Sequence, residues 1–270
     1  MSHYQNRTKK RFGQHFLQDT YIINSLVHAI HPKPAQQIIE IGPGGGALTL
    51  PLLDYVDHLE VVELDRDVIA WWQAQKDLTD KLTIHAQDAL TLDFKALTHH
   101  DKIRVVGNLP YNISTPLIFH LLEQVDVIED MHFMLQKEVV DRLVAVAGNK
   151  EHGRMAVMVQ YLCETEFLFD VPPSAFSPPP KVDSAVVRLT PRRVIKEPVQ
   201  SIQKLSELVA LAFAQRRKTL RNNLKGILSD ADFEVLGIDP SRRAETLEVS
   251  EFVRITNYEL NQAMLRNADG

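Results

Sequence analysis

The sequence has very little cysteine: Cys163 is the single thiol among 270 residues. One cysteine excludes a disulfide framework and any zinc or iron–sulfur site that needs several thiolates. No apolar run approaches the roughly 18 residues that a membrane-spanning helix requires. The first residues, MSHYQNRTKKRFGQHFL, are basic but lack the apolar core of a secretory signal, and they are poorer in serine than a transit peptide. We therefore expect a cytoplasmic protein without a metal site.

The chain also lacks an excess of positive charge, because 35 acidic residues outnumber 30 basic ones. The resulting net charge of −5 argues against a nucleic-acid partner, since phosphate binding needs lysine and arginine. The basic residues are clustered, however, in two segments that contain no acidic residue. These are Arg7, Lys9, Lys10 and Arg11 near the N-terminus, and Arg216, Arg217, Lys218, Arg221 and Lys225 in a helix predicted over 215–225. Each cluster is either a solvated face or a phosphate-binding surface.

Hydrophobic residues make up 44% of the chain, which is enough for a large core. Five short apolar runs, at 38–41, 59–64, 82–84, 103–106 and 131–135, alternate with helical patterns, and a sixth strand is predicted at 184–189 after a proline-rich loop. This alternation predicts a parallel sheet covered by helices on both faces. After residue 191 the apolar spacing becomes helical, so we expect an α/β domain over 1–191 and a small helical domain over 192–270.

A glycine-rich loop follows the first predicted strand, with the sequence EIGPGGGALT over 40–49. Ligands of such sheets bind at the carboxyl ends of the strands. Gly42 lets the backbone turn and approach a ligand in front of a helix N-terminus. No lysine follows the glycines, which excludes a Walker loop, but the run also matches a dinucleotide-binding motif. The loop alone leaves the choice of nucleotide-like ligand open.

Carboxylates follow the next two predicted strands. Glu63 lies 21 residues after Gly42, where an acid can accept hydrogen bonds from both hydroxyls of a ribose. Asp88 follows the third strand and either receives an adenine amino group or caps a short helix. Asp65 is expected to cap the helix that follows Glu63. The two strand ends together indicate a ligand that contains adenosine.

The most specific motif is Asn108-Leu109-Pro110-Tyr111, directly after the fourth predicted strand. The Asn108 side-chain oxygen and a backbone carbonyl fixed by the proline provide two acceptors directed at one point. A planar amino group offers two matching donors. Tyr111 adds an aromatic face on which a flipped base can stack. The motif therefore predicts chemistry on an exocyclic amino group of a nucleobase.

These motifs together resemble the class I S-adenosylmethionine-dependent N6-adenine methyltransferases. The segments 11–17, 108–114, 134–138, 172–184 and 215–222 are similar to the ribosomal RNA adenine dimethyltransferases, the KsgA/RsmA family, and the likeness runs from about residue 7 to 255. It implies a Rossmann-like class I methyltransferase domain with a mostly parallel seven-stranded sheet and a C-terminal all-helical domain. It also implies S-adenosyl-L-methionine as cofactor and N6,N6-dimethylation of two adjacent adenosines in the 3′-terminal hairpin of 16S ribosomal RNA during 30S biogenesis.

The same resemblance implies individual roles. On the cofactor side, His15 and Leu17 would close over S-adenosyl-L-methionine, Gly42 would approach its methionine part, Glu63 would hold the ribose, and Asp88 the adenine, with Asn108 beside them. Asn108, Leu109 and Pro110 would bind the target amino group, and Tyr111 and Phe176 the target base. RNA would bind the two basic clusters, among them Arg7, Lys9, Lys10, Arg11, Arg216, Arg217, Lys218 and Arg221. The family commonly has asparagine in place of His15.

Three alternatives compete with this interpretation. An Erm-type enzyme would act on large-subunit RNA, but residues 108–114 and 215–222 favour the small-subunit enzyme. An NAD-dependent oxidoreductase has no use for the motif at 108–111, and the chain contains no Tyr-x-x-x-Lys pair. A non-catalytic ribosome assembly factor would not need the cofactor residues or Asn108. We expect a monomer that binds small-subunit ribosomal RNA in an assembling 30S particle. We expect no association with a membrane.

Overall fold

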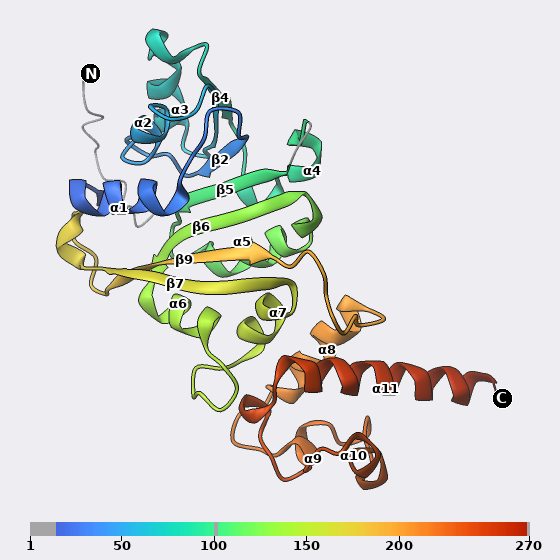
Figure 1. Cartoon of the computed structure of the whole chain (residues 1–270). Helices are drawn as coiled ribbons and strands as arrows, with labels where there is room; N and C mark the ends of the chain where they lie inside the picture. Colours follow the sequence, from blue (N-terminus) through green and yellow to red (C-terminus); the bar gives the residue numbers. More distant parts are fainter. Residues whose placement is uncertain (1–14, 100–101, 269–270) are drawn as a thin grey trace. The chain divides into compact units, whose positions relative to one another are not determined.

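The computed structural model describes residues 15–99 and 102–268 (Figure 1). The chain divides into two compact units. The first contains the residues up to Val140 together with Glu164–Pro191, and the second contains Asp141–Cys163 and the residues from Arg192 onward.

A seven-stranded sheet forms the centre of the first unit. Its strands, in spatial order, are β4 (Leu82–His85), β3 (Leu59–Val62), β2 (Ile38–Ile41), β5 (Ile103–Asn108), β6 (Ile128–Gln136), β9 (Ser184–Pro191) and β7 (Cys163–Val171). The four pairings from β4 through β6 are parallel, and β9 pairs antiparallel with β6. The predicted fold, a mostly parallel seven-stranded α/β sheet, is confirmed.

Both faces of this sheet are buried at its central strands β2 and β5, which explains why these strands are nearly continuous apolar runs rather than alternating ones. Ile38, Val61 and Val106 pack in one core cluster with α1 (Thr20–Ile30), α2 (Thr49–Leu52) and α3 (Arg66–Gln73). Strand side chains alternate between faces, so Ile39 and Val105 point the other way, and they are equally buried. The remaining helices of the first unit are α4 (Phe94–Leu97), α5 (Ser114–Leu122) and the first half of α6 (Lys137–Val144).

A second, two-stranded sheet joins the N-terminal segment to the proline-rich loop. Strand β1 (Phe16–Leu17) pairs antiparallel with β8 (Phe176–Ser177), so that Leu17 lies opposite Phe176. The backbone N–H groups of Gln18 and Asp19 also donate to the carbonyl of Ala175, at 2.8 and 3.2 Å. Asp19 then caps α1 by accepting from Tyr21 and Ile22. Short strands held by distant partners leave no periodic pattern in the sequence, and neither was predicted.

The second unit is built from helices: α7 (Arg154–Leu162), α8 (Ile202–Ala212), α9 (Leu220–Asn223), α10 (Asp230–Leu236) and α11 (Val249–Ala268). Residues 141–163 were predicted to belong to the α/β domain, and the structure instead groups them with the helices. The reason is that α7 buries its apolar residues against α8 and α11. Among the described residues, none of the helices has the length and apolar composition to cross a membrane.

The prediction of one helix over 215–225 is wrong. Helix α8 ends at Ala212 and α9 begins only at Leu220, and the basic residues between them lie in a turn. The Asn223 side chain donates to the carbonyls of Ala212 and Gln215, at 2.7 and 3.2 Å. Carbonyls at the end of a helix need such partners, and a side chain that supplies them closes the turn.

Candidate active site

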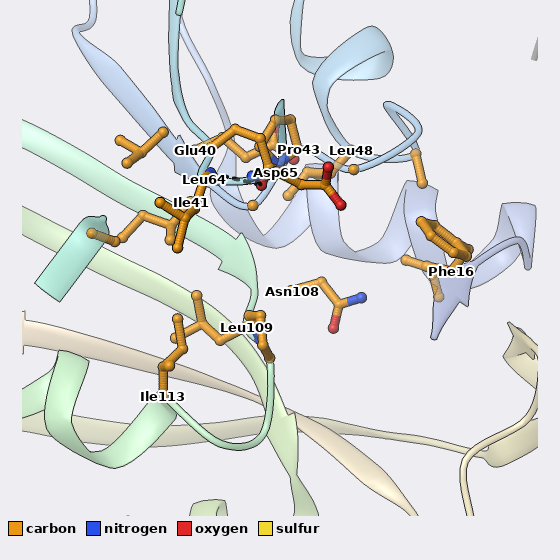
Figure 2. Close-up of a pocket in the computed structure, with 18 of the residues that line it drawn as sticks. Phe16, Glu40, Ile41, Pro43, Leu48, Leu64, Asp65, Asn108, Leu109 and Ile113 are labelled. Carbon is orange, nitrogen blue, oxygen red and sulfur yellow. Dashed lines mark hydrogen bonds between the residues drawn. The ribbon is translucent and has the colours of Figure 1, made fainter. Parts of the chain in front are cut away.

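A cavity of roughly 240 Å³ opens where β2, β3, β4 and β5 reach their carboxyl ends (Figure 2). It lies within the first unit. The structure brings to it all the residues that were predicted to bind the cofactor or the target base: His15, Leu17, Gly42, Glu63, Asp88, Asn108, Leu109, Pro110, Tyr111 and Phe176. Parallel strands end at one edge of their sheet, which is why residues far apart in the sequence meet here.

The glycine loop after β2 is held from two sides. The Gly42 N–H donates to the carbonyl of Val62 at 2.9 Å, and the Trp72 indole N–H of α3 donates to the carbonyl of Gly44 at 3.0 Å. A Cβ on Gly46 would lie 2.9 Å from the Trp72 ring, so only glycine fits there. Gly42 has a φ of +72° and no atom within 4 Å of an added Cβ, so its backbone faces open space. Sequence reasoning missed the supporting role of Trp72.

Glu63 is fixed at the end of β3 by its own loop. Its carboxylate oxygen Oε1 accepts from the backbone N–H groups of Leu64 and Asp65, at 2.8 and 2.9 Å. Burial raises the pKa of Glu63, and the two N–H groups work against this shift. Asp65 caps α3 by accepting from the N–H of Asp67 at 2.9 Å, as predicted. The arrangement presents the Glu63 carboxylate to the cavity in one orientation.

Asp88 has the capping role that the sequence offered as one of two alternatives, and its place in the cavity leaves the other, contact with an adenine amino group, as a prediction. It caps the short helix η3 (Ala89–Thr91) by accepting from the N–H of Leu90 at 2.9 Å, and it also lines the cavity. A carboxylate has two oxygens and can accept several hydrogen bonds at once. Capping therefore leaves Asp88 able to accept from a donor in the cavity.

Asn108 is the last residue of β5, and its side chain extends into the cavity (Figure 2). A Cβ on the preceding residue, Gly107, would lie 2.6 Å from the carbonyl oxygen of Ile41, so glycine is required where the two strands approach. The N–H of buried Leu109 donates to the carbonyl of Met134 at 3.1 Å and fixes the turn. Within the described part of the chain, the Asn108 side-chain amide makes no hydrogen bond, so its oxygen can accept from a ligand.

Aromatic residues form another part of the wall. The Tyr111 hydroxyl is 3.1 Å from the Ser184 hydroxyl, which holds the ring in place. The His15 imidazole lies 6.0 Å from the Tyr111 ring at an interplanar angle of 30°, and its Nδ1 donates to the carbonyl of Pro178 at 2.7 Å. Phe176 is held opposite Leu17 in the two-stranded sheet. Rings presented in this way can contact a planar base.

Glu40 is a cavity residue that sequence reasoning missed, although it begins the glycine motif. It is buried, and its Oε2 has no partner among the described residues. Burial, together with the nearby charge of Glu63 and against the opposing effect of the Thr49 hydroxyl, raises the pKa of Glu40 to about 8. Leu64, which is exposed and also lines the cavity, is another residue that sequence reasoning did not single out.

The charge of the cavity distinguishes between nucleotide-like ligands. Glu40, Glu63, Asp65 and Asp88 line it, and no lysine or arginine does so among the described residues. A pyrophosphate in this space would meet carboxylates without a compensating cation, whereas a neutral adenosine or a cationic group would not be repelled. The lining therefore suits a neutral or cationic ligand. The described residues also contain no cluster of three or more side chains that could hold a metal ion.

The basic residues behave differently from the cavity residues. Arg7, Lys9, Lys10 and Arg11 lie outside the described residues. In the second unit, Arg216 donates to the carbonyl of Lys150, and Arg221 Nε lies 3.0 Å from Asp230 Oδ1. Arg217 and Lys218 are exposed in the turn between α8 and α9. Two of the four predicted RNA contacts in this segment are thus already engaged within the protein.

Comparison with known proteins identifies the relatives of this chain. Residues 5–260 match the family model described as ribosomal RNA adenine dimethylase. A ribosomal RNA small subunit methyltransferase A from Laribacter hongkongensis is 58% identical over 249 residues, covering 92% of this chain and 95% of that protein. The protein of the same name from Pseudomonas aeruginosa is 53% identical over 255 residues, covering 94% and 95%.

Two solved structures share the fold. A dimethyladenosine transferase from Plasmodium falciparum matches with a TM-score of 0.74 and 24% identity over 89% of this chain and 96% of that one. The 23S rRNA methyltransferase ErmE matches with a TM-score of 0.70 and 23% identity over 90% and 98%. With the family model and the curated relatives covering nearly all of its length, the chain belongs to the ribosomal RNA adenine dimethylase family.

Proposed function

We propose that this protein is an S-adenosyl-L-methionine-dependent methyltransferase that dimethylates the N6 amino groups of two adjacent adenosines in the 3′-terminal hairpin of 16S ribosomal RNA, during biogenesis of the 30S particle. The observation that carries the proposal is the Asn108 amide, which has no hydrogen-bond partner among the described residues and extends from a strand end into an acidic cavity. The names of the relatives support the choice of small-subunit RNA.

The cavity residues fit S-adenosyl-L-methionine. Gly42 has open space in front of its backbone, where the methionine part would lie, and Glu63 would accept from the ribose hydroxyls. Asp88 would accept from the adenine amino group, and the segment from His15 to Leu17 would close the site. The acidic lining suits a ligand that carries a sulfonium and an ammonium group. When bound, S-adenosyl-L-methionine supplies a methyl group made electrophilic by the positive charge on its sulfur.

The chain's own residues would activate the target nitrogen. The N6 lone pair of adenine is delocalised into the ring and is a poor nucleophile. Its two N–H groups would donate to the Asn108 oxygen and to the carbonyl of Leu109 or Pro110. These two hydrogen bonds favour a more tetrahedral nitrogen with an available lone pair. Positive charge develops on N6 as it bonds the methyl carbon, so the same acceptor dipoles stabilise the transition state. Positioning contributes much of the remainder.

No general base is required for this reaction. The N6 cation formed by methyl transfer is strongly acidic and loses its proton to water. Tyr111 and Phe176 would hold the target base against the acceptors by stacking. Dimethylation needs the site to accept N6-methyladenosine as well, which keeps one N–H for the Asn108 oxygen.

The basic residues would bind the RNA backbone. Arg7, Lys9, Lys10, Arg11, Arg216, Arg217, Lys218 and Arg221 carry charge that phosphates attract, in a protein whose overall charge is negative. Arg217 and Lys218 are exposed and available for such contacts. We further propose that the enzyme acts as a monomer in the cytoplasm.

Labelled methyl transfer tests the proposal. Purified protein and labelled S-adenosyl-L-methionine are incubated with small subunits that lack methylation at the 3′-terminal hairpin, and the RNA is digested to nucleosides. We expect N6,N6-dimethyladenosine in small-subunit RNA and none in 23S RNA supplied as control. Labelling of 23S RNA instead would favour an ErmE-like reaction. A protein that binds NAD and does not bind S-adenosyl-L-methionine would favour an oxidoreductase.

A further inference from the structure

A polar network crosses three neighbouring strands of the sheet in the first unit. His85 Nε2 on β4 lies 2.6 Å from Glu60 Oε2 on β3. The other Glu60 oxygen accepts from the side-chain amide of Gln37 at 2.6 Å, directly before β2. The Gln37 amide also donates to the carbonyl of Leu97 at 2.7 Å, at the end of α4. None of the three side chains contributes to the cavity.

The network contains a carboxylate that is almost entirely inside the protein. The Glu60 residue is 7% exposed, and a buried carboxylate is costly unless hydrogen bonds or a cation compensate it. The imidazole and the Gln37 amide are its hydrogen-bond partners in the described part of the chain. Because carboxylate oxygens accept, His85 Nε2 carries the hydrogen, and the 2.6 Å separation is typical of a strong, charge-assisted bond.

The backbone of His85 connects this network to the candidate site. Its carbonyl oxygen accepts from the N–H of Glu63 at 3.1 Å and from the N–H of Gln87 at 3.0 Å. Glu63 begins one loop of the cavity, and Gln87 leads directly into Asp88 in the other. One peptide carbonyl thus joins the two loops that would hold the ribose and the adenine.

The position of this carbonyl depends on the side chain because β4 is an edge strand. Its single neighbour among the described strands is β3, and His85 is its last residue. A strand end with a partner on one side alone is prone to fray. The hydrogen bond to Glu60 holds the His85 Cα, and therefore the orientation of the peptide that follows it.

We propose that His85 is a positioning residue for the adenosine part of the cofactor, anchored by Glu60 and Gln37 and acting through its own backbone carbonyl on Glu63 and Asp88. This inference rests on the proposed function, since it assumes that the cavity binds an adenosine moiety. It assigns no contact between the imidazole and the ligand.

Calorimetry with two ligands tests the role. In the full-length protein, we expect His85→Leu to raise the dissociation constants for S-adenosylhomocysteine and for adenosine by about tenfold each, the cost of removing one hydrogen bond to a charged group. The kcat at saturating cofactor should stay within about twofold of wild type, because Asn108 is unaffected. His85→Gln, which keeps a donor near the Nε2 position, should recover most of the affinity.

A double-mutant cycle separates the proposed coupling from an unrelated effect. If His85 acts through Glu60, His85→Leu should add little to the affinity loss already caused by Glu60→Ala. Asp130→Asn provides the matched control, because Asp130 is paired with Arg104 at 2.9 Å in the same sheet and does not line the cavity. Asp130→Asn should lower the melting temperature without changing ligand affinity.

Three outcomes would overturn the inference. One is unchanged affinity in His85→Leu, and another is full additivity with Glu60→Ala. The third is that Asp130→Asn loses as much ligand affinity as His85→Leu when both variants lose the same amount of melting temperature. The affinity loss would then come from lower stability in general and not from the position of His85. Failure of the wild-type protein to bind S-adenosylhomocysteine at all would instead contradict the proposed function.

Discussion

The sequence singled out two sets of residues, those at the strand ends and the basic residues of 215–225. In the structure the two sets have different surroundings. The strand ends deliver Gly42, Glu63, Asp88 and Asn108 to one cavity. The basic segment forms a turn, in which Arg216 and Arg221 are bonded within the second unit and Arg217 and Lys218 are exposed. The first set has a geometry that implies a ligand, and the second has a charge that implies one.

The difference has a topological cause. A parallel sheet fixes where each strand ends relative to its neighbours, so a polar residue after a buried run is placed by the fold. A charge in a turn is placed by local side-chain contacts, such as those of Asn223, and the sequence pattern does not reveal these. Mutations at the strand ends should therefore produce larger and more specific losses than mutations in the turn.

Removal of the Asn108 side chain should have the largest effect. We expect Asn108→Ala to reduce the rate of methyl transfer by about 10²–10³-fold, the usual cost of one preorganised group at developing charge, with cofactor affinity retained. Single-turnover transfer to unmethylated small subunits measures the rate, and calorimetry measures the affinity. Asn112→Ala is the matched control, because Asn112 is exposed and lines the same cavity. Unchanged turnover in Asn108→Ala would refute the assignment.

Removal of the Glu63 carboxylate should have the next largest effect. Loss of a carboxylate that accepts from a ribose should weaken cofactor binding by about 10- to 100-fold in Glu63→Ala, the range for hydrogen bonds to a charged group. Glu63→Gln keeps one acceptor oxygen and should lose less. Equilibrium titration with S-adenosylhomocysteine measures both. If adenosine and S-adenosylhomocysteine bind Glu63→Ala as well as wild type, the ribose assignment fails.

Charge reversal in the turn should have a smaller, less specific effect. Replacing Arg216, Arg217, Lys218 and Arg221 by glutamate should weaken RNA or subunit binding about tenfold or more. It should also flatten the salt dependence by about 0.9 in slope for each phosphate that the protein no longer neutralises. Filter binding across a salt series measures the slope. Lys204→Glu is the control, since Lys204 is exposed on α8 and paired with Glu207. A slope equal to that of wild type would contradict RNA binding by this turn.

The last effect, that of the buried acid of the cavity, is on stability rather than on catalysis or binding. The pKa of Glu40 is about 8 in the folded protein against 4.5 ordinarily, so the folded state holds a proton that the unfolded state releases. The stability contributed by this group is present below pH 4.5 and is lost as the pH rises towards 8, at up to about 1.4 kcal/mol per pH unit. Glu40→Gln should remove this dependence.

Urea unfolding between pH 5 and pH 7 measures the effect of Glu40. The free energy of unfolding of Glu40→Gln should exceed that of wild type by an amount that grows with pH. Asp54→Asn, at an exposed carboxylate shortly after the glycine motif, serves as control and should follow wild type. A difference that shrinks as the pH rises would mean that Glu40 is ionised when buried.

Several local features could be predicted from the sequence because their causes are local. Asp65 caps α3 as expected from its place before a helical pattern, and the apolar runs at 38–41 and 103–106 form buried strands. The cavity residues were expected at the strand ends, partly from the residues and partly from the family resemblance. The roles within the site stay predictions until the variants above are measured.

Other features depend on contacts between distant segments. The indole of Trp72 supports the glycine loop 28 residues earlier in the sequence. Strand β1 pairs with β8, which lies at the opposite end of the α/β sequence. Residues 141–163 join the helical unit because α7 finds its apolar partners in α8 and α11. No periodicity in the sequence around these residues specifies such partners.

The sequence by itself determined the fold class, the strand ends that carry polar residues, and the chemical types available there, because burial and strand period are encoded locally. Only the tertiary structure decided that the cavity is lined by four acids and no lysine or arginine among the described residues, that Glu40 is buried, and that the His85 carbonyl joins two loops. The physical reason is that net charge and motifs are properties of the chain, whereas desolvation and hydrogen-bond partners are properties of its packing.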